Sequence, residues 1–118
     1  GKILYLPLKK KWFNSIKRGT KKEEYREINE FWGKRLVDEE SMIRDFNSPN
    51  FDDSISCQDL LMKHVRHFEF VVFTLGYPKA DDTKRRLVFK NPKIRIGEGK
   101  PKWGAEKGKT YYVITWEE

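Results

Sequence analysis

The chain has 118 residues, a length that suits one domain over residues 1–118 and leaves little material for a second one. Its formal net charge of +7 favours a polyanionic partner, because each Lys or Arg near a phosphate releases a bound counterion. No apolar run approaches the length of a membrane span, so we expect no membrane partner, and the single cysteine, Cys57, indicates a reducing compartment such as the cytoplasm.

The first predicted elements are a strand and a helix. The apolar run of residues 3–6 predicts a short buried strand that ends at Pro7, which lacks the backbone donor of a central strand. Between residues 8 and 18, apolar side chains recur on one helical face with lysines opposite, which predicts an amphipathic helix. Gly19 is expected to end this helix in the left-handed conformation.

The next segment combines extended, helical and acidic patterns. Residues 21–28 read as extended, and Asn29 is a predicted N-cap for a second helix. The stretch 38–56 is rich in Asp, Asn and Ser with little periodicity, which predicts a long loop before a short helix over residues 58–65. We treat residues 38–59 as an acidic insertion or loop, because their seven acidic residues and one basic residue give a net charge of −6 and leave +13 on the rest of the chain.

The second half of the chain is dominated by strand patterns. Residues 68–75 alternate with period two, and the apolar runs 87–89 and 94–96 continue the pattern, with Pro92 between them indicating a bulge, a bend or a sheet edge. The aromatic and β-branched run 111–116 predicts a last strand. We therefore expect an α+β domain whose sheet or barrel is small and mostly antiparallel, with helices in its early crossovers.

The most informative short motif comes directly after the first predicted helix. It places Gly19, Lys21, Glu24 and Arg26 within eight residues. In an extended segment, period-two alternation puts Glu24 and Arg26 on one face and Tyr25 on the other. An amine, a carboxylate and a guanidinium would then share one wall of a cleft.

This motif carries a family resemblance. It resembles the G-x-K-x-x-E-x-R signature of the activating signal cointegrator homology (ASCH) domain, in particular its bacterial and phage members. The likeness covers most of the chain outside the acidic segment, and three further stretches share it: Leu6-Pro7-Leu8-Lys9 through Trp12-Phe13, Glu27-Ile28 to Trp32, and Ile96-Gly97-Glu98-Gly99 with Trp103-Gly104-Ala105.

The resemblance implies a fold, a ligand class and an activity. It implies a small β-barrel similar to the PUA domain of RNA-modifying enzymes, with a cleft between barrel and helices that binds RNA or a modified nucleoside. Some small members hydrolyse the acetyl amide of N4-acetylcytidine, and others are ribonucleases. Lys21 matches the lysine thought to act in the amidohydrolases, whereas those enzymes have threonine where this chain has Glu24, and either Glu98 or Glu106 could match their later glutamate.

The chemistry of the motif permits both binding and catalysis. A lysine in an apolar cleft beside Arg26 loses proton affinity and becomes usable as a base or nucleophile, with Glu24 as its catalytic neighbour. If Glu24 is ionised close to Lys21, it holds the lysine charged, which suits phosphate binding better. We therefore favour binding, while an exposed strand whose ion pairs each contribute about 0–1 kcal/mol is the structural alternative.

Other features are compatible with a nucleic-acid partner. The lysine run 9–11 could guide a phosphate backbone or form a solvated helix face. The glycine-rich stretch 97–104 lacks the spacing of a nucleotide-binding loop. It could place Trp103 against a base, where stacking is worth about 1–3 kcal/mol. The alternative is that the Trp103 ring packs on the barrel. A second basic band consists of Lys79, Lys84, Arg85, Arg86, Lys90, Lys93 and Arg95.

Two remaining features concern metals and protein partners. Cys57, His64 and His67 do not have the spacing of a common zinc site, and we expect neither a metal nor a cofactor. The acidic segment 38–59 is a candidate surface for a basic protein partner, which would make the chain an adaptor, or it folds back over the domain's own lysines.

Overall fold

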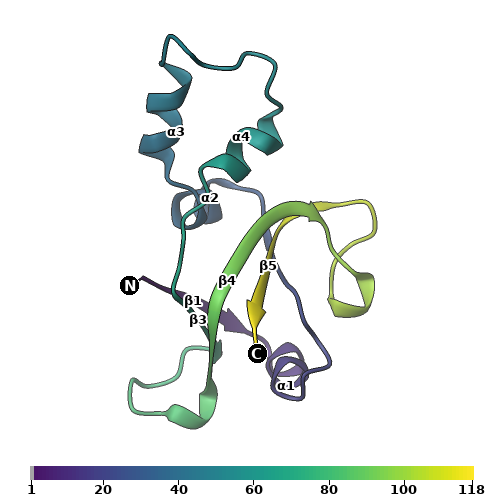
Figure 1. Ribbon diagram of the computed structural model, residues 1–118. Helices are drawn as coiled ribbons and strands as arrows, with labels where there is room; N and C mark the ends of the chain where they lie inside the picture. Colours follow the sequence, from purple (N-terminus) through teal and green to yellow (C-terminus); the bar gives the residue numbers. More distant parts are fainter. Residues whose placement is uncertain (1) are drawn as a thin grey trace.

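A five-stranded mixed sheet is the scaffold of residues 2–118, the part of the chain that the computed structural model describes (Figure 1). The strand order is β1-β3-β4-β5-β2; β1 pairs parallel with β3, and the other neighbours are antiparallel. This confirms the predicted α+β class. The strands are β1 (Ile3–Leu8), β2 (Glu24–Glu27), β3 (Phe70–Leu75), β4 (Arg86–Glu98) and β5 (Thr110–Glu117).

Four α-helices and two 3₁₀ turns complete the described residues. Two of the helices lie in the connections on either side of β2, and the other two form a hairpin before β3. None of the helices within residues 2–118 has the length and apolar character needed to cross a bilayer. The helices are α1 (Lys10–Lys17), α2 (Glu30–Leu36), α3 (Glu39–Phe46) and α4 (Cys57–Lys63), and the 3₁₀ turns are η1 (Thr83–Arg85) and η2 (Pro101–Trp103).

The first strand continues beyond its predicted end. β1 includes Pro7 and runs to Leu8, because β1 lies at the edge of the sheet and pairs only with β3. The Pro7 carbonyl faces away from β3 and accepts a hydrogen bond from Arg26, so the missing proline N–H also lies on the open side and breaks no ladder.

The larger of the two hydrophobic clusters in the described residues packs α1 against the sheet. Phe13 and Ile16 of α1 are buried in it together with side chains of β1, β3 and β5. This confirms the amphipathic helix, although the helix begins at Lys10 because residues up to Leu8 belong to β1. Trp12, which the apolar stripe assigned to the same face, is only half buried.

The two apolar runs around Pro92 form a single strand. β4 has 13 residues, and its pairing shifts register between Lys90 and Lys93, where Asn91 has a positive φ of 50°. This confirms the predicted bulge at Pro92. The first part of β4 pairs with β3 and the second part with β5, so the bulge lies where the strand changes its main partner.

The long loop predicted for residues 38–56 is wrong, because the acidic segment 38–59 is partly helical. It contains α3 and the start of α4, separated by residues 47–56. The Asp38 side chain caps α3 by accepting from the Ser41 N–H at 3.1 Å, and two glutamates occupy the first turn, where the helix dipole favours negative charge. The helix also has a short apolar stripe at Met42, Ile43 and Phe46 that the compositional bias obscured.

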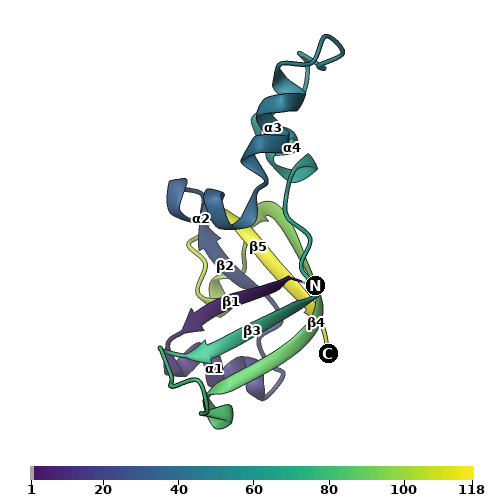
Figure 2. The same ribbon diagram turned by 90° about the vertical axis from the view of Figure 1, so that its left-hand side faces the viewer.

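Residues 38–64, the α3–α4 hairpin, extend away from the sheet. Figures 1 and 2 both show this hairpin projecting along the long axis of the molecule. The domain measures 50 × 33 × 23 Å, and its radius of gyration of 15.5 Å exceeds the value of about 13.5 Å expected for a compact domain of this length. The hairpin therefore offers a surface that is separate from the sheet.

Candidate functional site

A cavity of about 470 Å³ opens beside the two edge strands, β1 and β2. Side chains from α1, α2 and the loop around η2 complete its wall. Its charged lining groups are equally divided in sign, and its apolar lining is mostly aromatic. The charged residues are Lys9, Lys21, Arg26, Glu24, Glu27 and Glu106, and the aromatic residues are Trp12, Tyr25, Trp32, Trp103 and Tyr111.

The turn after α1 brings Lys21 into this cavity. Gly19 has a φ of +77°, as the predicted helix end requires, and the N–H groups of Thr20 and Lys21 both donate to the Ser15 carbonyl at 3.0 and 3.2 Å. The Thr20 carbonyl then accepts from the indole N–H of Trp103 at 2.9 Å. Gly19 does not line the cavity, so its contribution is to the path of the backbone.

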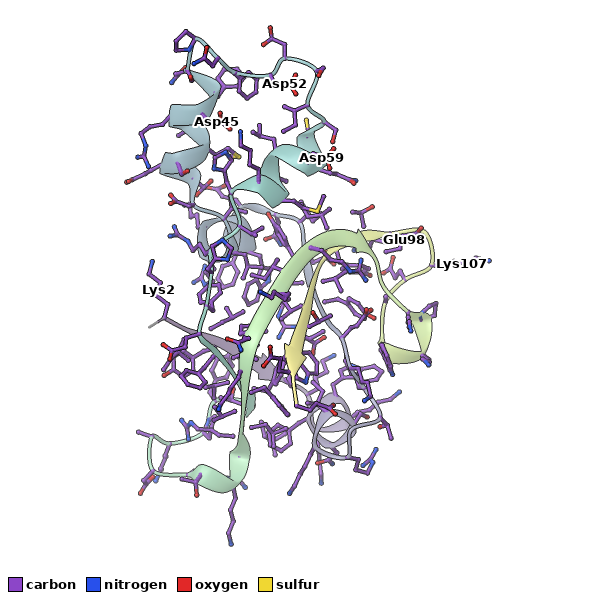
Figure 3. The ribbon with its side chains drawn as sticks, in the orientation of Figure 1. Lys2, Asp45, Asp52, Asp59, Glu98 and Lys107 are labelled. Atoms are coloured by element: carbon purple, nitrogen blue, oxygen red, sulfur yellow. The ribbon has the colours of Figure 1, made fainter. Side chains whose placement is uncertain are left out.

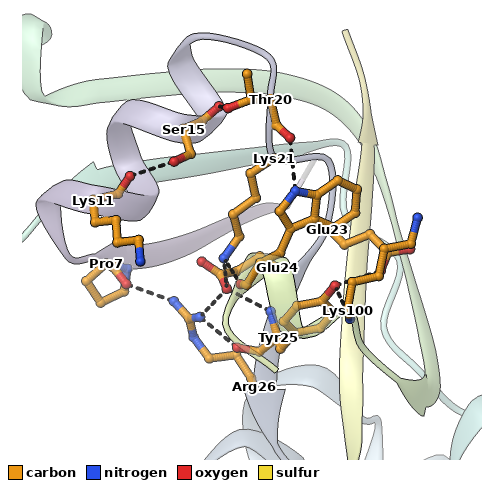
Figure 4. A network of polar contacts seen from close by, with 11 residues as sticks. Pro7, Lys11, Ser15, Thr20, Lys21, Glu23, Glu24, Tyr25, Arg26 and Lys100 are labelled. Carbon is orange, nitrogen blue, oxygen red and sulfur yellow. Dashed lines mark hydrogen bonds and ion pairs between the residues drawn. The ribbon is translucent and has the colours of Figure 1, made fainter. Parts of the chain in front are cut away.

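The Lys21 ammonium is buried and surrounded. Its exposed fraction is 1%, and Nζ donates to Glu24 Oε1 at 3.2 Å and to the Trp103 carbonyl at 2.7 Å (Figure 4). The Trp12 ring centroid lies 4.0 Å from Nζ, within the range of a cation–π contact. The alternative of an exposed strand with weak ion pairs is therefore wrong at this position.

Glu24 connects the two cations of the motif. It is 4% exposed, and its Oε1 accepts from the Tyr25 backbone N–H at 2.8 Å, in addition to Lys21. The same oxygen lies 3.5 Å from the Arg26 guanidinium. We call these three ionic side chains the Lys21–Glu24–Arg26 network, and the structure brings them together as the motif predicted.

Arg26 bridges the two edges of the sheet. From β2 it donates to the Pro7 carbonyl of β1 at 2.8 Å and to its neighbour's carbonyl, Tyr25 O, also at 2.8 Å (Figure 4). The guanidinium carbon lies 5.1 Å from the centroid of the Trp32 ring. Because its N–H donors are used in this way, the guanidinium holds the wall of the cavity in place. It does not offer a free pair of donors to a phosphate.

Burial governs the acid–base properties of the site. Burial lowers the pKa of the Lys21 ammonium, while the attraction of Glu24 partly offsets this effect. Burial likewise lowers the pKa of Arg26 and raises the pKa of the Tyr25 hydroxyl above its ordinary value. Lys21 is therefore more easily deprotonated than a surface lysine.

Tyr25 and two glycines hold the loop around η2 against the cavity. The Tyr25 hydroxyl donates to Glu23 and accepts from the Lys100 N–H at 2.9 Å. A Cβ at Gly99 would lie 2.5 Å from the Tyr25 ring, and one at Gly104 would lie 2.8 Å from the Trp12 ring. The glycine-rich stretch is thus explained by close packing on aromatic rings.

Trp103 lies at the cavity and is also held by hydrogen bonds within the domain. Its half-buried ring lines the cavity, while its indole N–H and its carbonyl are engaged by Thr20 and Lys21. The ammonium groups of Lys100 and Lys102 lie 4.7 and 4.8 Å from its ring centroid. This tryptophan is consequently a fixed part of the rim with positive charge beside it.

Sequence reasoning missed several parts of the cavity wall. Trp12 was assigned to the core stripe, and Trp32 and Tyr111 received no role, although all three line the cavity. The abundance of tryptophan near the motif is the signal that could have found them. Of the two candidate glutamates, Glu106 lines the cavity, whereas Glu98 is an exposed residue at the end of β4.

The second basic band is only partly available. Arg86 donates to carbonyls of residues 78, 79 and 82, and Arg95 pairs with Glu23 at 3.2 Å. These two guanidiniums are therefore engaged within the domain, whereas Lys84, Lys90 and Lys93 have exposed side chains.

The residues considered for zinc have different surroundings. Cys57 is exposed at the start of α4, and His64 bonds to Ser41 and Asp45. Within residues 2–118, no group of three or more His, Cys, Asp or Glu side chains is arranged to hold a metal ion.

Comparisons with known families, curated proteins and solved structures found no match to this chain.

Proposed function

We propose that this chain is an ASCH-type, PUA-like domain that binds a nucleobase, from single-stranded RNA or from a modified nucleoside, in the cavity beside β1 and β2. The observation that carries the proposal is the set of five aromatic side chains around the buried Lys21–Glu24–Arg26 network. The resemblance of the motif to the ASCH signature points to the same ligand class.

The cavity has the size and lining of a small-molecule site. Its volume of about 470 Å³ lies within the usual range of ligand pockets, roughly 300–1,000 Å³. Stacking on an aromatic side chain is worth about 1–3 kcal/mol per base and needs only a flat ring, which every base provides. Half-buried Trp32 and Trp103 present such rings at the cavity.

The charges favour a base inside the cavity and phosphates outside it. Three cationic and three anionic side chains line the cavity, and two of the cations, Lys21 and Arg26, are already paired with Glu24. A phosphate would therefore find little net attraction inside, whereas carboxylates can accept from exocyclic amines of a base. Lysines beside the tryptophans, at positions 11, 100 and 102, would contact the flanking phosphates.

The curled sheet supports the PUA-like part of the proposal. β1 and β2 are the two ends of the strand order, yet the Arg26 guanidinium reaches the Pro7 carbonyl across the space between them. The two edge strands therefore approach each other, as in a sheet that curls towards a small barrel, and the cavity lies beside them.

Calorimetric titration with cytidine, N4-acetylcytidine and short single-stranded RNA tests the proposal. We expect Trp32→Ala to weaken binding on the order of tenfold, because stacking contributes about 1–3 kcal/mol. Phe46→Ala is the matched control, since this aromatic ring is 63% exposed on the α3–α4 hairpin and does not line the cavity. If none of these ligands binds, or if both variants bind as the wild type does, the proposed site is wrong.

A second candidate function is hydrolysis of an acylated nucleoside or of RNA. The observation that favours it is the burial of Lys21, which lowers the pKa of its amine towards the range of a usable base or nucleophile. The two hydrogen bonds of Nζ oppose it, because they hold the amine as a donor.

Acetate release from N4-acetylcytidine and cleavage of RNA are the assays for this second function. Lys21→Met should abolish turnover, whereas Lys22→Met, at the adjacent exposed lysine, should retain it. Equal turnover in both variants, or none in the wild type, would exclude catalysis by Lys21.

A further inference from the structure

The α3–α4 hairpin carries two exposed apolar side chains, Ile43 and Phe46, that are not part of the core. Ile43 and Phe46 are 58% and 63% exposed, and α3 contains no buried residue. Together with Met42 and Leu60 they line a groove of about 150 Å³, and the Phe46 ring packs on Phe51 with centroids 5.1 Å apart. A cluster of this kind, surrounded by polar groups, is typical of an interaction surface.

The hairpin is held in a defined shape. The His64 ring bonds to the Ser41 hydroxyl at 2.9 Å and to the Asp45 carboxylate at 2.8 Å, which links the end of α4 to α3. Lys63 also pairs with Asp45 at 2.8 Å. Because these contacts fix the two helices before any partner binds, little conformational entropy of the hairpin is lost on binding.

The surface around the groove is strongly acidic. Figure 3 shows Asp45, Asp52 and Asp59 distributed along the hairpin, whose residues 38–64 carry a formal net charge of −5 even with Lys63 included. Like-charge repulsion disfavours nucleic acid and anionic membranes on this face. A partner with both apolar anchors and positive charge is complementary to it.

We propose that the groove between α3 and α4 binds a basic amphipathic helix of a partner protein. Two helices with an apolar groove between them accept the apolar face of a third helix, whose anchors recur at i, i+3, i+4 and i+7. The lysines and arginines of the partner then lie against the acidic rim. This surface is separate from the cavity beside β1 and β2, so the proposal stands independently of nucleobase binding.

Within residues 2–118, a second copy of this chain does not supply such a helix. Its lysine-rich helix, α1, has basic residues on one side, but Phe13 and Ile16 on the other side are buried against the sheet. The occupant is therefore a different protein segment.

A Leu/Lys peptide of about four helical turns, with leucines at i, i+3, i+4 and i+7, is the probe. Calorimetry should detect binding to the full chain, and the double variant Ile43→Ser/Phe46→Ser should weaken it on the order of tenfold or more, because it removes the apolar anchors. Val88→Ser is the matched control, since Val88 is 60% exposed on β4, far from the hairpin in sequence. Glu39→Gln/Glu40→Gln should weaken binding and reduce its dependence on salt.

Three outcomes would overturn the proposal. One is equal binding of a scrambled peptide of the same composition, which would show that charge alone attracts it. Another is unchanged affinity in the Ile43/Phe46 double variant, with circular dichroism confirming its fold. The third is a dimer in sedimentation experiments that the same double variant dissociates, which would assign the groove to a second copy.

Discussion

Replacement of Glu24 by glutamine tests whether the carboxylate compensates two cations, the buried Lys21 and the half-buried Arg26. Glu24 is 4% exposed and lies 3.2 Å from the Lys21 ammonium and 3.5 Å from the Arg26 guanidinium. Glutamine keeps the shape and the hydrogen-bonding capacity but removes the negative charge. Because removal of one partner of a buried ion pair costs about 3–5 kcal/mol, we expect Glu24→Gln to lower the free energy of unfolding by that amount.

Urea denaturation at neutral pH measures this loss, and a thermal scan should show a midpoint lowered by roughly 12–20 °C. Lys21→Met is the informative partner variant, because it leaves Glu24 paired with Arg26 and should cost less. In the double variant, Lys21→Met/Glu24→Gln, the two changes remove a mutual interaction. Its loss should therefore fall short of the sum of the single losses by about 0.5–3 kcal/mol.

A free energy of unfolding for Glu24→Gln within about 0.5 kcal/mol of the wild-type value, the range of ordinary surface substitutions, would contradict this expectation. Strict additivity in the double variant would contradict it too, since the pair would then contribute no coupling. Either result would mean that the cations are compensated by groups other than this carboxylate.

Three further predictions concern pH, the cavity rim and the hairpin. Burial raises the pKa of the Tyr25 hydroxyl above its ordinary value of 10.0, so its contribution to stability is present below pH 10 and is lost as the pH rises beyond it. Tyr25→Phe should therefore reduce the fall in the free energy of unfolding at alkaline pH, as measured by urea denaturation. Gly104→Ala should lower the free energy of unfolding by more than Gly108→Ala, for which backbone strain alone predicts a loss of roughly 1–2 kcal/mol. Both glycines have a positive φ, but only the Cβ added at Gly104 meets the Trp12 ring. Equal thermal midpoints of the two variants would contradict this. His64→Ala removes the hydrogen bonds of the His64 ring to Ser41 and Asp45 and leaves the Lys63–Asp45 ion pair in place. Hydrogen exchange should then show faster opening of the hairpin amides and no change in β3 and β5.

Local signals allowed much of the secondary structure to be predicted. Gly19 ends α1 with a positive φ, Asn29 caps α2 by accepting from the Trp32 N–H, and Pro92 lies at a bulge. Each of these features depends on backbone conformation or on hydrogen bonds within a few residues. The Lys21–Glu24 contact was equally accessible, because its members are three residues apart.

The remaining parts of the fold and site depend on contacts between distant segments. The Arg26 bond to the Pro7 carbonyl and the Lys21 bond to the Trp103 carbonyl join residues 19 and 82 positions apart. No local pattern specifies such partners. The helix α3 was missed for a different reason, because its acidic composition suggested a loop although Asp38 and the apolar stripe satisfy the requirements of a helix.

The seam between β1 and β2 has a consequence for which molecules the domain can admit. The strands on either side of it are joined through the Arg26 side chain, whereas every neighbouring pair in the strand order is joined by a backbone ladder. Rotation of one arginine can therefore change the width of the opening without breaking the hydrogen bonds of any pair of strands. The shape of the cavity mouth thus depends on one side-chain rotamer, while the backbone of the sheet stays as it is.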